Sequence, residues 1–351
     1  MNLIKSRAFI FSVIFTLILL LLISCKRPEH GREAIMVYTS VPIKTVERIK
    51  LKFEERYPRI EVLIFRAGTG NILEKIHQEL EDGEIKADVI WLADFSDAEE
   101  LKALDVILKY STPESEKIIP VFIDPDGFYY GSRIINMVVA YNKLSVKGKL
   151  KNYNDLLRPE LRGKIGISNP KNSGSALYTI GALLLDKDYG WEYFVKLYGN
   201  DCQVIDNNIL LTEKIAGGEL YAGITIDFSV RGLLKDYPSM QIEYVYPYDG
   251  MVVIASPISI VKGSRNIKNS KTFVNWILSK ECQEFMGREL GIVSVRNDIN
   301  IPELNFNINE LKVIPANPGQ IYRNKENILR IFSDIFSGMK VDELNINLNE
   351  Q

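Results

Sequence analysis

The acid that ends an apolar segment, Asp227, is the residue whose position most needs a chemical explanation. The apolar run 222–226 predicts a buried strand, and Asp227 and Phe228 follow it directly. An ionised carboxylate at the end of a buried strand costs free energy unless it is paired or hydrated. Asp227 could cap a helix that begins at Phe228. It could also stand at the mouth of a cleft and accept hydrogen bonds from a ligand's ammonium or hydroxyl groups.

Small polar residues follow several other predicted strands, where open α/β sheets bind their ligands. The free N–H groups and partial positive charge of a helix N-terminus suit phosphate, phosphonate or carboxylate groups. Serine, threonine, asparagine and glycine are also favoured helix caps, so one such set alone indicates only a cap. Three sets together favour an anion site. Its candidate residues are Thr39, Ser40, Gly68, Thr69, Gly70, Asn71, Asp94, Ser173, Gly174, Ser175 and Asp227.

Asp94 and two residues outside this set, Arg133 and Trp91, allow two interpretations each. Asp94 follows a predicted strand, but it could equally cap the helix expected at 96–105. Arg133 could bind a phosphoryl group through two parallel hydrogen bonds, or it could form a surface salt bridge. Trp91 lies inside a predicted strand, which favours a place in the core over a role as a stacking platform.

The sequence contains no motif of an enzyme or a metal site. Gly68-Thr69-Gly70 lacks the third glycine of a dinucleotide fingerprint, and no P-loop or nucleophile-elbow pattern occurs. His77 is the only histidine beyond residue 30, which leaves a serine nucleophile without a base. Cys202 and Cys282 lie in segments that we expect in different domains, so we expect no disulfide between them. We therefore expect no catalysis, no bound metal and no cofactor.

The elements that must position the candidate residues alternate between strand and helix from residue 34 onward. Apolar runs predict strands at 34–40, 60–68 and 87–94, and helical periodicity lies between them. This order predicts an α/β fold with a mostly parallel sheet. Further strands are expected at 134–142, 221–227, 242–247 and 251–261, and helices at 173–185, 191–198, 270–291 and near 325–337. A chain of 351 residues has room for about two domains.

The N-terminus has the pattern of a secretory signal. Lys5 and Arg7 precede a long apolar run, and the segment 22–25 resembles a bacterial lipobox that ends in Cys25. We expect a lipoprotein signal peptide at 1–24, lipidation of Cys25 and a tether at 25–33; the alternative is a transmembrane anchor. Either way the folded part lies outside the cytoplasmic membrane. The net charge of −2 gives no reason to expect a nucleic-acid partner.

The order of these segments resembles the solute-binding proteins of bacterial ABC importers. The stretches that carry the resemblance are 37–42, 87–94, 138–143, 153–176, 215–228 and 246–266. The resemblance implies a two-lobe (type II) periplasmic binding protein, each lobe a mostly parallel sheet flanked by helices. It also implies a monomer that takes a small solute to a permease and ATPase complex. It places lobe one at 34–137 plus 255–351 and lobe two at 138–254, with two crossing hinge strands between them.

The ligand is the least determined part of the resemblance. Ferric-binding relatives carry two adjacent tyrosines where this chain has Asp227 and Phe228. The resemblance therefore favours the branch that binds 2-aminoethylphosphonate or sugar phosphates, with ferric iron as the alternative. An extracellular enzyme on the same fold, or a sensor or adhesin lipoprotein without a transport role, are the rival functions of another class.

Overall fold

The structure is a computed structural model of the chain, and it describes residues 33–304, 306 and 312–339. The predicted signal peptide, Cys25 and the tether up to residue 32 lie outside the described residues. Within the described part, no helix is both long and apolar enough to cross a membrane.

The first half of the chain folds as the alternating pattern predicts. The strands β1 (Glu33–Thr39), β2 (Ile60–Arg66) and β3 (Val89–Trp91) lie parallel, with β1 in the middle. The helices α2 (Ile43–Arg56), α3 (Thr69–Glu81) and α4 (Phe95–Ala103) follow them in turn. Helix α2 buries one stripe, Val46, Ile49 and Phe53, against this sheet. The parallel strands bring their carboxyl ends, and the residues after them, to one edge.

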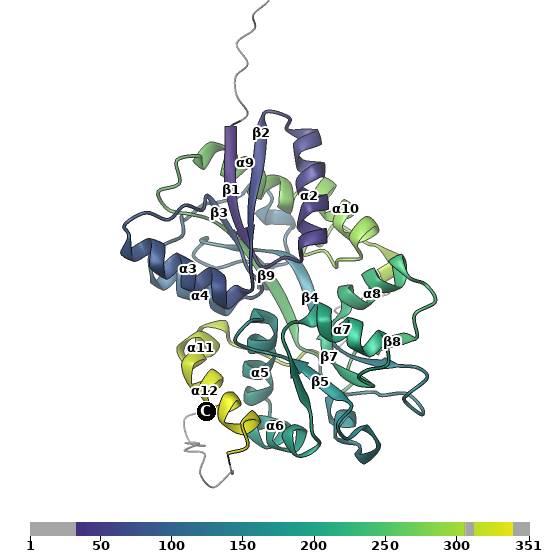
Figure 1. Ribbon diagram of the computed structural model, residues 1–351. Helices are drawn as coiled ribbons and strands as arrows, with labels where there is room; N and C mark the ends of the chain where they lie inside the picture. The colour runs from purple at the N-terminus through teal and green to yellow at the C-terminus, as the bar shows by residue number, and fades with distance from the viewer. Residues whose placement is uncertain (1–32, 305, 307–311, 340–351) are drawn as a thin grey trace, which may run out of the picture.

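Two long strands carry the sheet from the first half into the second. Strand β4 (Tyr130–Asn142) is buried along its whole length and pairs antiparallel with β9 (Val253–Ile260) up to Asn136. From Met137 to Tyr141 it pairs with β7 (Ala222–Ile226) instead. Figure 1 shows β4 and β9 running together through the middle of the molecule. The prediction of two crossing strands between two lobes is therefore confirmed.

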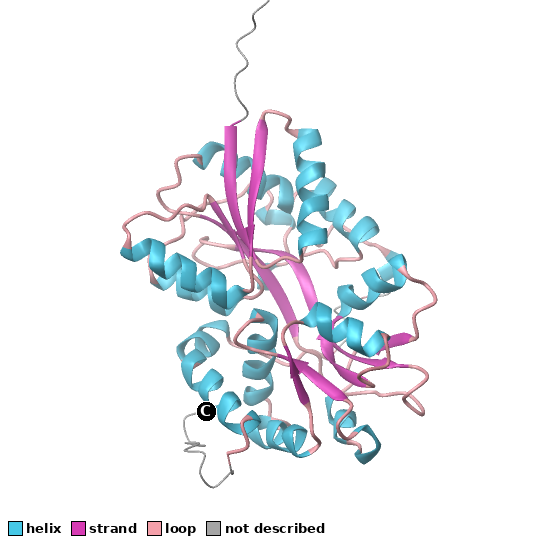
Figure 2. Cartoon of the chain, in the orientation of Figure 1, coloured by secondary structure: helices cyan, strands magenta, loops and turns pink. Residues whose placement is uncertain are grey.

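The second lobe repeats the architecture around its own parallel strands. The strands β5 (Ile165–Ser168), β6 (Gln203–Ile205) and β7 are parallel, and β8 (Ile242–Val245) pairs with β4. The helices are α5 (Gly174–Leu185), α6 (Gly190–Gly199), α7 (Asn208–Ala216) and α8 (Asp227–Asp236). Helices cover both faces of the sheet in each lobe (Figure 2). Short 3₁₀ turns lie at Ser115–Lys117, Pro120–Phe122, Tyr153–Leu157, Pro159–Leu161 and Pro302–Leu304.

The C-terminal third differs from the prediction in two places. The helical pattern at 270–291 forms two helices, α9 (Ile267–Leu278) and α10 (Lys280–Leu290), because Ser279 adopts an extended backbone and caps α10 at the N–H of Cys282. Helix α11 (Pro318–Arg323) precedes α12 (Lys325–Phe336). Phe332 and Phe336 of α12 pack on aromatic rings of α6. The sequence places 255–351 in lobe one, but because of this packing we propose that α12 belongs to lobe two with α5 and α6.

Candidate functional site

A small cavity of about 60 Å³ lies between the two lobes. One buried water needs roughly 10–15 Å³ of such volume, so the cavity has room for a small anion. Of the residues predicted from sequence, the cavity wall contains Ser40, Gly68, Thr69, Ser173, Gly174 and Ser175. Thr39, Gly70, Asn71, Asp94 and Asp227 are not in its wall. The wall also contains Pro42, Arg66, Ala93, Arg133, Ile135, Asn172, Asn207, Asn208, Ile209, Ile226 and Phe228.

Five helices have their N-caps in the wall of this cavity, and three of these helices are capped by a glycine or by a residue with a polar side chain. Their caps are Gly68 for α3, Ser173 for α5 and Asn207 for α7. Ser173 accepts a hydrogen bond from the N–H of Ala176, so its side chain satisfies only one of the unpaired N–H groups in the first turn of α5. Three helix N-termini directed at one space give it a positive potential before any side-chain charge is added.

Arg133 adds a full positive charge to the same cavity. The residue is only 2% exposed, and its Nε donates to Ser256 Oγ at 3.2 Å, while its Nη1 is buried and makes no hydrogen bond within the described chain. The guanidinium lies 5.2 Å from the centre of the Phe228 ring. Burial lowers the pKa of Arg133 to about 9, so the guanidinium is still charged at neutral pH.

The backbone of β4 explains how Arg133 reaches the cavity. The pairing of β4 with β9 shifts register between Gly131 and Ile134, on either side of Arg133. A bulge of this kind turns a side chain away from the alternation of a regular strand. The sequence gives no sign of the bulge, so periodicity alone could not place Arg133 on the cavity wall.

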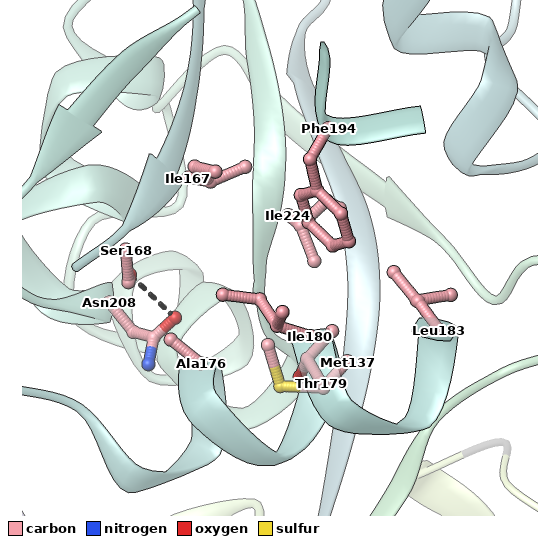
Figure 3. A pocket seen from close by; sticks show the side chains of 10 residues that line it. All are labelled: Met137, Ile167, Ser168, Ala176, Thr179, Ile180, Leu183, Phe194, Asn208 and Ile224. Carbon is pink, nitrogen blue, oxygen red and sulfur yellow. Dashed lines mark hydrogen bonds between the residues drawn. The ribbon is translucent and has the colours of Figure 1, made fainter. Parts of the chain in front are cut away.

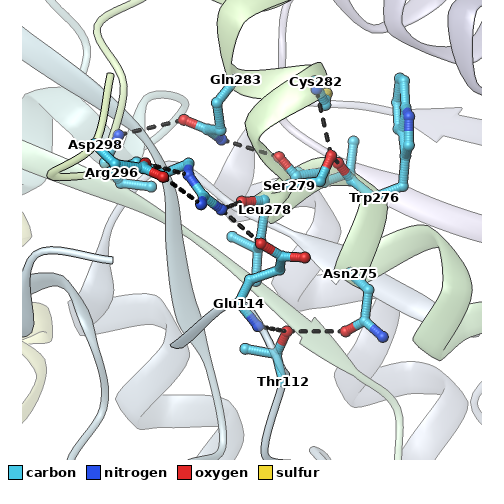
Figure 4. Close-up of polar contacts among 12 residues, drawn as sticks. Thr112, Glu114, Asn275, Trp276, Leu278, Ser279, Cys282, Gln283, Arg296 and Asp298 are labelled. Carbon is cyan, nitrogen blue, oxygen red and sulfur yellow. Dashed lines mark hydrogen bonds and ion pairs between the residues drawn. The ribbon is translucent and has the colours of Figure 1, made fainter. Parts of the chain in front are cut away.

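Arg296, also buried, shows how this chain satisfies a cation that serves structure alone. Arg296 contacts Asp298 at 2.8 Å, Glu114 at 2.6 Å and the carbonyl oxygen of Leu278 at 2.8 Å (Figure 4). Those partners neutralise the charge and accept its N–H groups. Because Arg133 has one hydroxyl partner and no carboxylate in hydrogen-bond contact, its charge is available to an anion in the cavity.

Two hydroxyl groups in the wall, like Arg133 Nη1, are buried and lack a hydrogen-bond partner within the described chain. Ser40 Oγ and Thr69 Oγ1 are buried, and neither forms a hydrogen bond within the described chain. Buried polar groups in folded proteins nearly always have partners. Three such donors around one positive cavity fit the oxygens of a tetrahedral oxyanion.

Asn208, which the sequence analysis did not single out, fixes the start of α5. Its Nδ2 donates to Ser173 Oγ at 3.1 Å and to Ser175 Oγ at 2.9 Å, and its Oδ1 accepts from Ser168 Oγ at 2.9 Å. Figure 3 shows the last contact beside an apolar cavity of about 20 Å³ that lies behind α5. This side chain ties the starts of α5 and α7 to the end of β5, so the cavity wall is rigid on this side.

Asp227, the acid from which the sequence analysis began, is an internal counter-ion. It is fully buried in the first turn of α8, and its Oδ2 lies 2.7 Å from both Arg231 Nη2 and Asn136 Nδ2. Its Oδ1 accepts from the N–H of Phe228 at 2.8 Å. With both oxygens engaged and no place in the cavity wall, Asp227 is not directed at a ligand.

The remaining predicted residues have local roles in this structure. Asp94 caps α4 and accepts from the N–H of Ser96 at 2.9 Å, which is the second of the two roles that the sequence suggests for it. Thr39 donates to the carbonyl oxygen of Trp91 at 2.9 Å. Gly70 lies against the other lobe, because a Cβ on it would stand 2.3 Å from the carbonyl oxygen of Lys171.

A second, larger cavity of about 570 Å³ adjoins the first. The two share Pro42, Arg66, Asn207, Ile209 and Phe228 in their walls. The outer cavity reaches to α2, α8 and the end of α10. The site therefore has a small positive inner chamber and a roomy outer chamber.

Comparison with known proteins identifies the class to which this two-lobe fold belongs. Residues 35–289 match the family model described as bacterial extracellular solute-binding protein. The chain belongs to this family. A relative from Sinorhizobium fredii, named "Probable ABC transporter periplasmic-binding protein", is 24% identical over 67% of this chain and 67% of its own length.

Two solved structures share the fold of this solute-binding protein over most of its length. AfuA of Actinobacillus pleuropneumoniae, solved with fructose 6-phosphate bound, has a TM-score of 0.79 at 26% identity and covers 88% of this chain and 100% of its own. Iron-bound HitA of Pseudomonas aeruginosa has a TM-score of 0.77 at 19% identity and covers 86% and 99%. The likeness to HitA shows the fold alone.

These matches establish the general role of the solute-binding protein. It is an extracytoplasmic binding protein of the ABC-importer class, whose members deliver a small solute to a permease. Its relatives are binding proteins of transport systems and not enzymes. Among the described residues, no group of three or more histidine, cysteine, aspartate or glutamate side chains could hold a metal ion.

Proposed function

We propose that this solute-binding protein captures an organic phosphate ester or phosphonate between its lobes. The observation that carries the proposal is Arg133, a buried cation with an unpartnered Nη1 in the wall of the inner chamber. A buried charge without a counter-ion is costly, and a phosphorus oxyanion would supply both the counter-charge and the hydrogen-bond acceptors. Ser40, Thr69 and the N-termini of α3, α5 and α7 would complete its coordination.

The outer chamber supports a ligand with an organic part. It is larger than an inorganic anion needs, and its wall is partly apolar, with Ile43, Ile209 and Leu233 among its residues. The carboxylates of Glu213 and Asp236 also line it, and they could accept hydrogen bonds from hydroxyl or amino groups. The bound fructose 6-phosphate of the 26%-identical AfuA agrees with a ligand of this kind.

Ferric iron remains the second candidate, because iron-bound HitA has the same fold. Fe(III) prefers anionic oxygen ligands, whereas the inner chamber offers a guanidinium, hydroxyl groups and helix N-termini. Cationic surroundings of this kind repel a trivalent cation. Iron would therefore need an additional anion bound beside it.

Delivery to an ABC permease and ATPase complex follows from the family. We propose that the chain acts as a monomer held at the outer side of the membrane by a lipid on Cys25, with residues 25–33 as the tether. Growth of cells in a radiolabelled lipid precursor tests the anchor. Label should enter the full chain and be absent from a Cys25→Ala variant.

The experiment that tests the ligand is a thermal unfolding series on the soluble chain that begins at Lys26. The panel contains fructose 6-phosphate, glucose 6-phosphate, 2-aminoethylphosphonate, inorganic phosphate and ferric citrate. A ligand at 100 times its dissociation constant stabilises the folded state by about 2.7 kcal/mol, which raises the midpoint by several degrees. We expect the largest rise with an organic phosphate or phosphonate.

A matched pair of variants decides whether the inner chamber is responsible. Arg133→Gln removes the buried cation and should abolish the ligand-induced rise. Arg158→Gln removes an arginine that pairs with Asp155 outside the site and should keep it. A rise with ferric citrate alone, together with coloured protein, would contradict the proposal.

A further inference from the structure

Two buried acids lie where the lobes meet, next to the inner chamber. Asp94 and Asp97 of α4 are 0% and 1% exposed. A Cβ on Gly174, at the start of α5, would stand 2.7 Å from Asp94 Oδ2 and 2.8 Å from Asp97 Oδ2. Only a glycine lets α5 approach this closely, so the two carboxyl groups are in contact with lobe two.

The charges around this pair do not balance. Glu100 of α4 adds a third carboxylate, and His77 of α3 lies 2.9 Å from it through Nε2. Lys325 of α12 is the neighbouring ammonium, 2.7 Å from Glu100 and 3.5 Å from Asp97. Tyr178 of α5 also faces Asp94 and is neutral at ordinary pH, because burial raises its phenol pKa further. Three carboxylates against one lysine, or one lysine and a protonated histidine, leave at least one negative charge in excess.

The hydrogen bonds show where a proton would resolve this excess. Asp94 Oδ1 accepts from the N–H and the hydroxyl of Ser96, but Asp94 Oδ2 and Asp97 Oδ2 have no donor. A single proton on Asp97 would provide a donor for Asp94 and remove one charge. Burial raises the pKa of both carboxyls, and the charge of Asp94 raises that of Asp97 further.

We infer that closure of the two lobes on the anionic ligand takes up one proton from solvent, which Asp94 and Asp97 then share. The inference rests on the proposed function, because it concerns the regulation of the same site. The first turn of α5 faces the inner chamber and the acid pair at once, through Gly174 and Ser175. A second ionised carboxylate there would compete with the ligand for the positive end of α5 and repel it.

The direction of the pH effect follows from linkage. In an open form these acids face solvent and have ordinary pKa values near 4; closure raises them, so the closed form binds more protons. Ligand affinity therefore falls by up to tenfold per pH unit as pH rises from the open-state pKa to the closed-state pKa, and it levels off above the closed-state pKa. Release of the ligand would be favoured at higher pH.

Calorimetric titration of the soluble chain with fructose 6-phosphate, in two buffers of different ionisation enthalpy, measures the protons taken up. The wild type should take up close to one proton more per ligand than Asp97→Asn, whose amide donates to Asp94 permanently. Protonation of the phosphate itself is the same in both proteins and cancels. Glu74→Gln, an exposed acid of α3, should behave as the wild type. Equal uptake by wild type and Asp97→Asn would overturn the inference.

A measurement without ligand separates this inference from the proposed function. X-ray scattering should show the ligand-free wild type contracting as pH is lowered from about 8 to about 5, because a closed form that binds one more proton is favoured at lower pH. Asp97→Asn and Asp94→Asn should lose this pH-dependent contraction. If fructose 6-phosphate and the other phosphate probes all fail to bind, the proposed function fails, and the contraction alone decides. Contraction of the wild type that is lost in the variants supports the proton-sharing pair, and its absence from the wild type excludes it.

Discussion

At the scale of single residues, Arg133 and Asp227 show two outcomes for a buried charge. Asp227 is neutralised within the chain by Arg231 and held by Asn136. Arg133 has Asp227 only as a distant charge that favours its ionised form, while burial opposes it. The first arrangement stabilises the fold, and the second leaves a cation in the wall of the inner chamber without a counter-ion in hydrogen-bond contact.

Arg133→Met should therefore stabilise the ligand-free protein while it removes binding. The variant replaces a buried, poorly compensated cation with an apolar side chain of similar length. We expect a gain of about 1 kcal/mol or more in the free energy of unfolding, measured by denaturant unfolding without ligand. Loss of stability would mean that Arg133 is compensated by partners in solution and is structural. Arg158→Met is the control and should change stability by less than about 1 kcal/mol.

Asp227→Asn should destabilise the protein and leave ligand binding intact. Removing the carboxylate leaves Arg231 as a buried cation without its partner, which costs about 3–5 kcal/mol. The unfolding midpoint should fall clearly, yet the rise on adding ligand should persist, since Asp227 does not line the inner chamber. Asp201→Asn, which breaks an exposed pair with Arg162, should cost at most about 1 kcal/mol. Unchanged stability with lost binding would restore Asp227 as a ligand group.

At the scale of elements, the contact between the lobes depends on the starts of α3 and α5. Gly68 and Gly70 of the α3 start lie against the backbone at Asn172 and Lys171, and Gly174 lies against α4. None of the three has room for a Cβ. The N-termini of α3 and α5 can therefore meet at the inner chamber only because these positions have no side chain.

Gly70→Val should hold the lobes apart. Its Cβ would stand 2.3 Å from the carbonyl oxygen of Lys171, and backbone cannot yield as a flexible side chain can. Because ligand affinity depends on the population of the closed form, we expect it to fall by roughly tenfold or more, with the ligand-free protein still folded. X-ray scattering should show no contraction when ligand is added. Gly199→Val, where no atom lies near the added Cβ, should contract as the wild type does. Contraction of Gly70→Val as in the wild type would contradict this account of the contact between the lobes.

At the scale of the whole molecule, one sheet runs through both lobes. Its strand order is β2-β1-β3-β9-β4-β7-β5-β6, and the parallel strands of each lobe meet the antiparallel pair β4 and β9 at the centre. Hinge motion of the lobes must bend these two strands, while the cores on either side remain packed. Cys202 and Cys282, both free and buried, lie on opposite sides of this hinge.

Their thiols should therefore report global unfolding and not lobe opening. Burial raises the pKa of both thiols, so little reactive thiolate forms at neutral pH. In the soluble chain from Lys26, a thiol reagent should label neither cysteine in the presence or absence of ligand, and both in denaturant. Rapid labelling of one cysteine that ligand suppresses would show that lobe opening exposes part of a core.

The sequence by itself determined the class of fold and most of its elements. Alternating periodicity predicts β1 to β3 with their helices and the two crossing strands, because burial of one face requires that spacing of apolar residues. The small residues after strands and at helix starts predict an anion site, and six of them line the inner chamber. Local pattern contains this information, since helix starts and strand ends are recognised from neighbouring residues.

Only the tertiary structure decided which charges face the inner chamber. Asp227 and Arg133 both follow or occupy apolar strands, yet the first is neutralised by Arg231 one turn along α8 and the second is redirected by a bulge in β4. Local sequence pattern also could not predict the placement of α12 beside α6, because it depends on packing between segments far apart in the chain. Whether a buried charge serves the fold or a ligand depends on its partners in space, and the linear order of residues does not specify them.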